Sequence, residues 1–245
     1  MKMILRLALV LAALAQGHTA QAITGEAQLG SPAEASLLMI LTSDGHGSSH
    51  CTAIVLAPDV LLTAAHCVTP QAEMLAYWPG GQLQDMPRAQ RVAVHPLYRA
   101  NAPKTRERSV DLALIQINPP LPVRFVPIEI DYAPQIQVGT PLTISGFGLA
   151  TEQNGKTGGT LRSAQLVTRE PLSKLLIWAK DARNAATGGC TGDSGGPFLS
   201  VEGKLVGITI WSQGTGNRAC GELTQALRLD AARSFIETTR AQWAR

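Results

Sequence analysis

A serine surrounded by glycines is the first feature of the sequence that could carry out chemistry. Residues 192–197 read Gly-Asp-Ser-Gly-Gly-Pro, with Ser194 near the centre. A serine hydroxyl is a weak nucleophile until a neighbouring base removes its proton, and the oxyanion formed by its attack on a carbonyl needs hydrogen-bond donors. Glycines allow the backbone beside the serine to turn its N–H groups toward one point. The segment therefore indicates a nucleophilic serine; the alternative is a glycine-rich turn with an incidental serine.

Candidate partners for Ser194 lie earlier in the chain. His66 follows an apolar segment and directly precedes Cys67, which could anchor it. Asp111 stands at the start of another apolar segment. A single histidine is more often structural than catalytic, and an acid directly before a strand is usually a solvated loop residue. Neither His66 nor Asp111 is therefore a strong catalytic candidate alone, and the case for each depends on the presence of the other and of Ser194.

The order of the three residues distinguishes two classes of serine hydrolase. The serine segment also satisfies the Gly-x-Ser-x-Gly motif of α/β-hydrolases, whose triad runs serine, acid, histidine along the chain. Here no histidine follows Ser194, so that triad cannot be completed in its usual order. The order His66, Asp111, Ser194 is instead that of the chymotrypsin group.

The elements that must position these residues read as short strands. Segments rich in Val, Ile, Leu and Thr alternate with stretches that contain Pro, Gly, Asn and Asp. The expected strands are 53–56, 60–63, 91–94, 112–117, 142–145, 161–168 and 205–211. Apolar residues at helical spacing between Asp230 and Arg245 predict one terminal helix that packs on the strands. No repeated strand–helix unit is evident, which favours an all-β domain over a parallel α/β sheet.

The first 22 residues have the pattern of a cleaved signal peptide. Lys2 and Arg6 give a positive start, residues 4–15 are almost entirely apolar, and residues 20–22 read Ala-Gln-Ala. The apolar run is too short to span a bilayer. We therefore expect residues 1–22 to be removed and the protein to be secreted or periplasmic.

Composition and cysteine content argue against a disordered chain, a nucleic-acid-binding protein and a zinc protein. Of the 245 residues, 45% are hydrophobic and 16% charged, a globular balance. Loss of Lys2 and Arg6 reduces the formal net charge of +3 to about +1, which does not favour nucleic-acid binding. The four cysteines of an exported chain allow three disulfide pairings. They include no Cys-x-x-Cys pair, which disfavours zinc.

Taken together, these motifs resemble those of the trypsin/chymotrypsin family of serine proteases, over essentially all of residues 23–245. The sequence Thr-Ala-Ala-His-Cys at 63–67 resembles the family's histidine motif, Asp-Leu-Ala-Leu at 111–114 its aspartate motif, and residues 192–197 its serine motif. Gly-Phe-Gly at 146–148 resembles a segment that is usually Gly-Trp-Gly. The resemblance implies an all-β fold of two antiparallel six-stranded β-barrels with a C-terminal α-helix.

The resemblance also implies a division of the chain and a framework of disulfides. The two barrel halves would meet at a boundary near residues 118–135. The cysteines would pair as Cys51–Cys67 and Cys190–Cys220, with the first bridge holding the histidine and the second bracing the substrate pocket. Other bridges common in animal members are absent, so the chain looks like a bacterial secreted member.

The family's catalytic roles map onto residues of this sequence. The resemblance implies a serine endopeptidase in which Ser194 attacks the carbonyl, His66 takes and returns the proton, and Asp111 orients the imidazole. The backbone N–H groups of Gly192 and Ser194 would form the oxyanion hole. An acyl-enzyme would be the intermediate, and no cofactor or metal is implied.

Activation in this family depends on a newly freed amino terminus. The resemblance implies that the amino group of Ile23 pairs with Asp193, the acid just before the nucleophile. Because the signal-peptide pattern ends at Ala22, signal peptidase itself could generate the active form. Cleavage after Ala15 is the alternative, and it would leave residues 16–22 as a removable pro-segment.

The resemblance places five residues around the substrate pocket. Gly188 occupies the position where trypsin carries an aspartate, Gly189 follows it, and Trp211 forms a wall. Ser212 and Thr224 stand where two glycines would leave an open slot for an aromatic ring. We therefore expect a narrow pocket that prefers small or medium uncharged residues before the scissile bond.

An alternative alignment leaves the pocket preference open, and one departure from the family pattern bears on the efficiency of catalysis. A slip of one residue in the alignment could bring Asp181 or Glu222 near the pocket and restore a preference for basic residues. Ile210 precedes Trp211 where the family normally has a serine, so Asp111 would lose one hydrogen bond.

The expected partners are protein or peptide substrates. We expect neither nucleic acid nor a stable membrane anchor once the signal peptide is removed, and a monomer is the default assembly. Two other functions stay open: a catalytically weak pseudoprotease that acts as a secreted binding module, and an esterase with little turnover of peptides.

Overall fold

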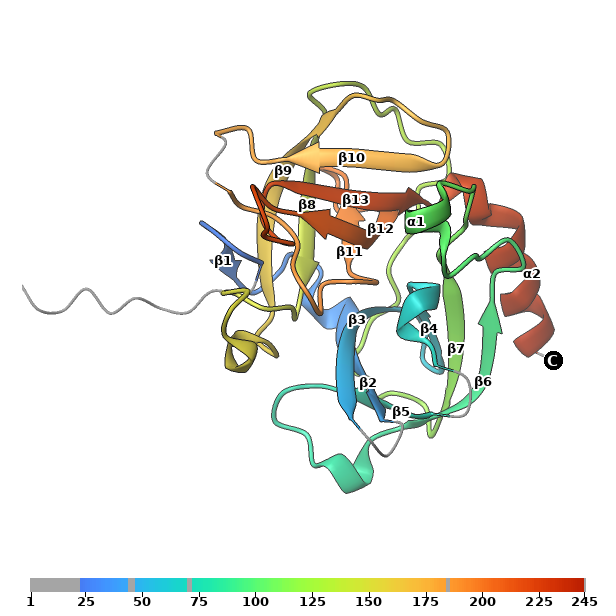
Figure 1. Cartoon of the computed structure of the whole chain (residues 1–245). Helices are drawn as coiled ribbons and strands as arrows, with labels where there is room; N and C mark the ends of the chain where they lie inside the picture. The colour runs from blue at the N-terminus through green and yellow to red at the C-terminus, as the bar shows by residue number, and fades with distance from the viewer. Residues whose placement is uncertain (1–22, 44–46, 70–71, 184–185, 245) are drawn as a thin grey trace, which may run out of the picture.

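Two β-barrels make up the described part of the molecule, with a helix at the carboxyl end (Figure 1). The computed structural model describes residues 23–43, 47–69, 72–183 and 186–244. The signal peptide expected at residues 1–22 lies outside these ranges.

The first barrel is closed by six antiparallel strands in the spatial order β2-β3-β4-β7-β6-β5. Its strands are β2 (Leu37–Ser43), β3 (Ser48–Ala57), β4 (Val60–Thr63), β5 (Glu73–Tyr77), β6 (Arg88–Val94) and β7 (Ala113–Asn118). On β2, Leu38 and Ile40 belong to the core of this barrel, whereas Leu37 and Met39 belong to a cluster shared with the second barrel. Because successive side chains point to opposite faces of a strand, β2 is buried on both faces.

The second barrel is closed in the same way, because β8 pairs with both β9 and β11. Its strands are β8 (Pro141–Gly146), β9 (Arg162–Arg169), β10 (Leu176–Lys180), β11 (Pro197–Leu199), β12 (Leu205–Gln213) and β13 (Leu223–Arg228), and the short β1 (Gln28–Leu29) pairs with β9. Ile144, Leu166 and Phe198 fill its core. The two six-stranded barrels confirm the predicted fold.

A third apolar cluster joins the two barrels and the terminal helix. It combines Leu62 of the first barrel, Ile208 of the second and Ile236 of α2 (Arg233–Trp243). The helix follows a short 3₁₀ turn, η5 (Asp230–Ala232), and both lie in the segment where the sequence predicted a helix. Burial of the apolar side of α2 confirms that the helix packs on the barrels.

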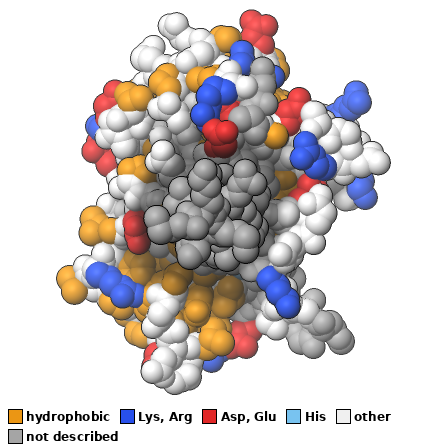
Figure 2. All heavy atoms as spheres, turned by 90° about the vertical axis from the view of Figure 1, so that its left-hand side faces the viewer, with side chains coloured by type: hydrophobic (Ala, Val, Ile, Leu, Met, Phe, Trp, Pro, Cys, Tyr) orange, Lys and Arg blue, Asp and Glu red, His pale blue; other side chains and the backbone are white. Residues whose placement is uncertain are grey.

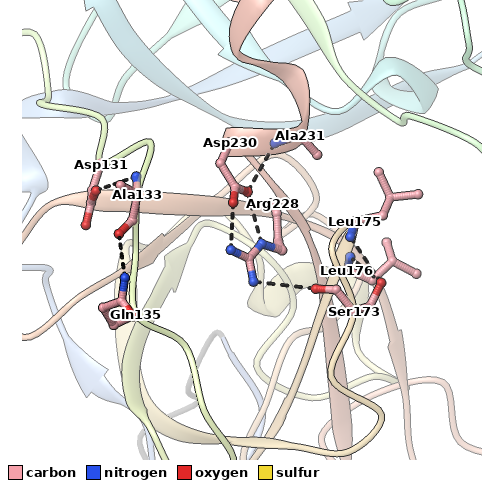
Figure 3. Close-up of polar contacts among 9 residues, drawn as sticks. All are labelled: Asp131, Ala133, Gln135, Ser173, Leu175, Leu176, Arg228, Asp230 and Ala231. Atoms are coloured by element: carbon pink, nitrogen blue, oxygen red, sulfur yellow. Dashed lines mark hydrogen bonds and ion pairs between the residues drawn. The ribbon is translucent and has the colours of Figure 1, made fainter.

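The turn into the terminal helix is held by an arginine (Figure 3). Arg228, the last residue of β13, donates from Nε and Nη2 to the two carboxylate oxygens of Asp230, at 3.0 and 2.6 Å. Its Nη1 donates to the carbonyl oxygen of Ser173 at 3.4 Å. The Ser173 hydroxyl in turn accepts the N–H groups of Leu175 and Leu176. These contacts fasten the entry to the helix onto the loop before β10.

Short helical turns and connecting segments complete the described chain. They are η1 (Glu34–Ser36), η2 (Ala65–Cys67), η3 (Leu83–Asp85), α1 (Ala102–Thr105) and η4 (Gly155–Thr157). None of the described helices has the length and apolar character needed to cross a membrane. The face drawn in Figure 2 carries basic and acidic side chains alike, as the small net charge of the chain leads one to expect.

Candidate active site

Strand pairing brings two of the candidate residues to the same edge of the first barrel. β4 and β7 are antiparallel neighbours, with Thr63 opposite Ala113. His66 lies three residues beyond Thr63, in η2, and Asp111 lies two residues before Ala113. In an antiparallel pair, the chain leaving one strand and the chain entering the other are at the same edge. The local sequence therefore juxtaposes the histidine and the acid.

The Asp111 carboxylate makes two hydrogen bonds with His66. Oδ1 accepts the backbone N–H of His66 at 2.9 Å, and Oδ2 lies 2.7 Å from Nδ1 of the imidazole. The Asp111 side chain is 15% exposed and the His66 side chain 36% exposed. A carboxylate at this position fixes the tautomer with the proton on Nδ1, because a carboxylate oxygen only accepts. Nε2 of His66 is then the ring nitrogen without a proton, which can act as a base.

A disulfide anchors the turn that carries the histidine. Cys51 of β3 is joined to Cys67 of η2, with their Cα atoms 6.1 Å apart. The Thr42 hydroxyl of β2 also donates to the Cys67 carbonyl oxygen, at 3.4 Å. The sulfurs of Cys51 and Cys67 and a ring nitrogen of His66 are atoms that can bind a metal, and they lie within 4.8 Å of one another. Since the two sulfurs are bonded to one another, they are not the free thiolates that bind metals.

The loop of residues 192–196, called the serine loop below, lies against the same edge of the first barrel. The Ser194 carbonyl oxygen accepts the backbone N–H of Thr52, on β3, at 2.9 Å. Gly195 has a φ of 81°, and a β-carbon on it would collide with the Thr52 carbonyl oxygen and the Thr63 hydroxyl. Glycine thus allows the loop to approach the strand that leads to His66. Within the described residues the Ser194 hydroxyl forms no hydrogen bond. In substrate-free enzymes the hydrogen bond between a nucleophile and its base often tightens only when substrate binds.

Two N–H groups of the serine loop are left without an acceptor. The N–H groups of Asp193, Gly195 and Gly196 donate to the carbonyl oxygens of Cys190, Thr209 and Asp193. Those of Gly192 and Ser194 have no acceptor within the described part of the chain. Gly192 has a φ of 96°, a conformation that favours glycine. The loop can therefore offer two donors to a developing oxyanion next to Ser194.

The buried carboxylate of Asp193 ties the serine loop to neighbouring backbone. Asp193 is 1% exposed, and its two oxygens accept the N–H groups of Gly148 and Cys190, each at 2.8 Å. A β-carbon on Gly146 would collide with Asp193, so glycine is needed there for space. Burial raises the pKa of the Asp193 carboxyl to about 7, and the two N–H groups and the positive charge of Arg162 oppose the shift.

The segment that begins at Ile23 is docked on the second barrel. The Ile23 side chain is fully buried in the core of that barrel. Thr24 and Gly188 exchange backbone hydrogen bonds of 3.0 and 3.2 Å. Gly25 has a φ of 88°, and its missing side chain leaves room for Thr187. The segment expected to carry the new amino terminus therefore packs directly on Gly188, one of the residues expected to line the pocket.

The structure brings four of the five expected pocket residues together, namely Gly188, Gly189, Ser212 and Thr224. Gly188 and Gly189 face Thr224, whose hydroxyl accepts the Gly189 N–H at 2.9 Å. A β-carbon on Gly189 would lie 3.1 Å from the Thr224 methyl carbon and 3.7 Å from the Ser212 β-carbon. Trp211, the fifth residue, precedes Ser212 on β12 and is 39% exposed. Side chains of Thr224 and Ser212 thus fill space that glycines would leave open.

The second disulfide lies next to the expected pocket residues, and the contacts of Asp181 and Glu222 are described with it. Cys190 and Cys220 are bonded, with Cα atoms 4.6 Å apart. The Asp181 carboxylate accepts the backbone N–H of Arg183 at 2.9 Å and lies 3.6 Å from its Nε. Glu222 contributes its backbone N–H to the carbonyl oxygen of Gln213, at 2.8 Å. Only Oδ1 of Asp181 is thus engaged by Arg183.

Two residues near the site were not identified from the sequence. Thr52 follows the expected half-cystine Cys51 and touches the serine loop, and Arg162 is 5% exposed on β9 and acts on Asp193. A buried polar residue in an apolar strand is a usable signal, because such groups need partners. The sequence alone does not say which partners.

Comparisons with known proteins agree on one family. The family described as Trypsin matches residues 29–230. Trypsin from Saccharopolyspora erythraea is 29% identical over 196 residues, which cover 71% of this chain and 80% of that protein. Human kallikrein-8 is 30% identical over 190 residues, which cover 70% of this chain and 68% of that protein. The solved structure of neuropsin, a serine protease expressed in mouse brain, superposes with a TM-score of 0.68 and 22% identity, over 88% of this chain and 99% of that one.

Proposed function

Because the chain belongs to the trypsin family of serine endopeptidases, we propose that Ser194, His66 and Asp111 carry out its peptide hydrolysis. Nε2 of His66 takes the Ser194 proton as the hydroxyl oxygen attacks the peptide carbonyl. Asp111, bonded to Nδ1 at 2.7 Å, stabilises the imidazolium that results. The imidazolium then gives its proton to the leaving amine, and water hydrolyses the acyl-enzyme by the same route.

The observation that carries this proposal is the hydrogen bonding of the serine loop. Among its N–H groups, those of Gly192 and Ser194 are left unbonded within the described residues, directly beside the nucleophile. We propose them as the oxyanion hole. Preorganised donors of this kind are worth about 100- to 1000-fold in rate for each donor.

The pocket residues support a preference for small or medium uncharged residues before the scissile bond. Thr224 and Ser212 occupy the slot, and Gly188 contributes no carboxylate at its base. A charged guanidinium buried there would lack an ionic partner, which is costly. The competing preference for basic residues needs Asp181 or Glu222 to reach the pocket.

Activation is proposed to follow removal of residues 1–22, which would make the protein secreted or periplasmic. The freed amino group of Ile23 would supply a positive charge to Asp193, whose carboxyl is buried. The peptidase domain would then span residues 23–245, with its two halves meeting near 118–135. Such a domain would act as a monomer, without cofactor, metal, nucleic acid or a membrane anchor.

The proposal is tested by digestion of a diverse peptide library, with products identified by mass spectrometry. We expect cuts after Ala, Val, Thr or Leu, all absent with Ser194→Ala. Cuts after Arg or Lys would keep the triad and contradict the pocket assignment. If protein verified to begin at Ile23 cuts no peptide, the triad proposal is wrong and a binding module becomes the better account.

A further inference from the structure

A threonine of the first barrel reaches into the serine loop of the second. Thr52 lies on β3 directly after the half-cystine Cys51 and is fully buried. Its side-chain hydroxyl donates to the Gly192 carbonyl oxygen at 2.9 Å and accepts the Phe147 N–H at 3.1 Å. Its backbone N–H donates to the Ser194 carbonyl oxygen at 2.9 Å. One residue therefore contacts the carbonyls of both residues proposed as oxyanion donors.

These contacts restrict the orientation of the loop. A peptide group is planar, so a fixed carbonyl oxygen also fixes the N–H at the other end of that peptide. The hydroxyl of Thr52 holds the peptide between Gly192 and Asp193, and its N–H holds the peptide between Ser194 and Gly195. The free N–H groups of Gly192 and Ser194 lie on the peptides next to these two. Fixing the flanking peptides limits the directions in which the free groups can point.

The hydroxyl is suited to this task by its chemistry. Both of its partners are backbone groups, one acceptor and one donor, and a threonine hydroxyl can donate and accept at once. Phe147 is 2% exposed, so water is not at hand to replace the contact. Without the hydroxyl, the Gly192 carbonyl would lose its partner and could turn to another.

We propose that the Thr52 hydroxyl is a positioning group for the oxyanion hole: it touches no reacting atom and acts through the Gly192 carbonyl. This rests on the proposed function of the serine loop. Small displacements of catalytic groups can cost about 100-fold in rate. Loss of the hydroxyl, with the backbone contact kept, should therefore lower kcat by about 10- to 100-fold. Since the pocket is untouched, KM should change by less than about 3-fold.

The test compares Thr52→Val, which removes the hydroxyl, with Thr52→Ser, which keeps it. The matched control is Thr168→Val: Thr168 is also a buried strand residue, and its hydroxyl donates to the Gln137 carbonyl oxygen, away from the serine loop. We expect the Val variant of Thr52 to lose kcat, the Ser variant to keep it, and the Thr168 variant to lose stability alone. Affinity for a peptide boronic acid, which mimics the tetrahedral intermediate, should fall in parallel with kcat/KM.

Three outcomes would overturn the proposal: an unchanged kcat in Thr52→Val, a loss confined to KM, or a loss equal in the Val and Ser variants. If Thr52→Val does not fold, Thr52→Ala against Thr52→Ser gives the same comparison. Ser194→Ala and wild type are measured alongside. Absence of turnover in wild type would contradict the proposed function itself, whereas active wild type with an unaffected Val variant would contradict the role of Thr52 alone.

Discussion

The buried carboxyl of Asp193 makes stability depend on how the chain begins. We consider two chains, both carrying Ser194→Ala to prevent self-digestion: one that begins at Ile23 and one that retains residues 16–22. In the extended chain no amino group is available at Ile23. The carboxyl then has the two backbone donors and the charge of Arg162, and burial still holds its pKa at about 7.

The magnitude follows from the difference between folded and unfolded pKa values. The unperturbed carboxyl has a pKa of 3.8, so a folded-state pKa of about 7 corresponds to about 4 kcal/mol, because a tenfold change in an equilibrium constant is worth 1.36 kcal/mol. Asp193 is 1% exposed, so solvent screening reduces this little. Between about pH 4 and 7 the folded state binds the proton and the unfolded state does not. The free energy of unfolding therefore falls as pH rises through this window and levels off above it.

The assay is urea unfolding of both chains at intervals from pH 4 to 8. Asp193→Asn in the extended chain is the control, because it keeps the burial and removes the titration. Relative to that control, the extended chain should lose about 4 kcal/mol between pH 4 and 8. The chain that begins at Ile23 should lose less, since its ammonium group favours the ionised carboxylate. Arg162→Met should move the loss to higher pH.

A flat pH dependence in the extended chain, relative to Asp193→Asn, would refute the reasoning about burial. Equal pH dependence in the extended chain and in the chain that begins at Ile23 would refute the pairing of the freed amino group with Asp193. The two conclusions are separable, because the first concerns the carboxyl alone and the second its partner.

Three further predictions concern the triad, its anchor and the pocket. Asp111→Asn should lower kcat by roughly 10⁴-fold at neutral pH with little change in stability, as measured by peptide hydrolysis and by unfolding, because the imidazole loses its correct tautomer. Replacing both cysteines of the Cys51–Cys67 disulfide by Ala should lower the free energy of unfolding by about 3 kcal/mol, seen in calorimetry as a drop in Tm of roughly 6–12 °C; an unchanged Tm would contradict the anchoring role. The double variant Ser212→Gly, Thr224→Gly should raise kcat/KM for Phe relative to Ala by about 10-fold or more, and an unaltered ratio would mean that these side chains do not line the pocket.

The strands that the sequence predicted are those with clear turn signals around a short apolar segment. β4 (Val60–Thr63) was predicted with its observed bounds, and β12 (Leu205–Gln213) within two residues. β2 (Leu37–Ser43) was not predicted, because one face fills the barrel and the other meets the second barrel, so no alternation of polar and apolar residues remains. β13 (Leu223–Arg228) was missed for the opposite reason, since polar residues interrupt its apolar ones.

The residues of the candidate site also fall into those that the sequence identified and those that it did not. His66, Asp111 and Ser194 lie in local motifs, so the sequence alone identified them as candidates. The contacts of Thr52 with Gly192 join residues 140 positions apart, across the two barrels. Such a contact depends on how the barrels close and pack against each other, and no local pattern in the sequence encodes it.

The most direct test of the central claim is covalent labelling of the chain that begins at Ile23 with a fluorophosphonate, followed by peptide mapping in a mass spectrometer. The proposed triad predicts a single adduct, on Ser194, that is strongly reduced in His66→Ala and slowed by peptide substrate. An adduct on another residue, or labelling of Ser194 that is unaffected by loss of the His66 side chain, would contradict it.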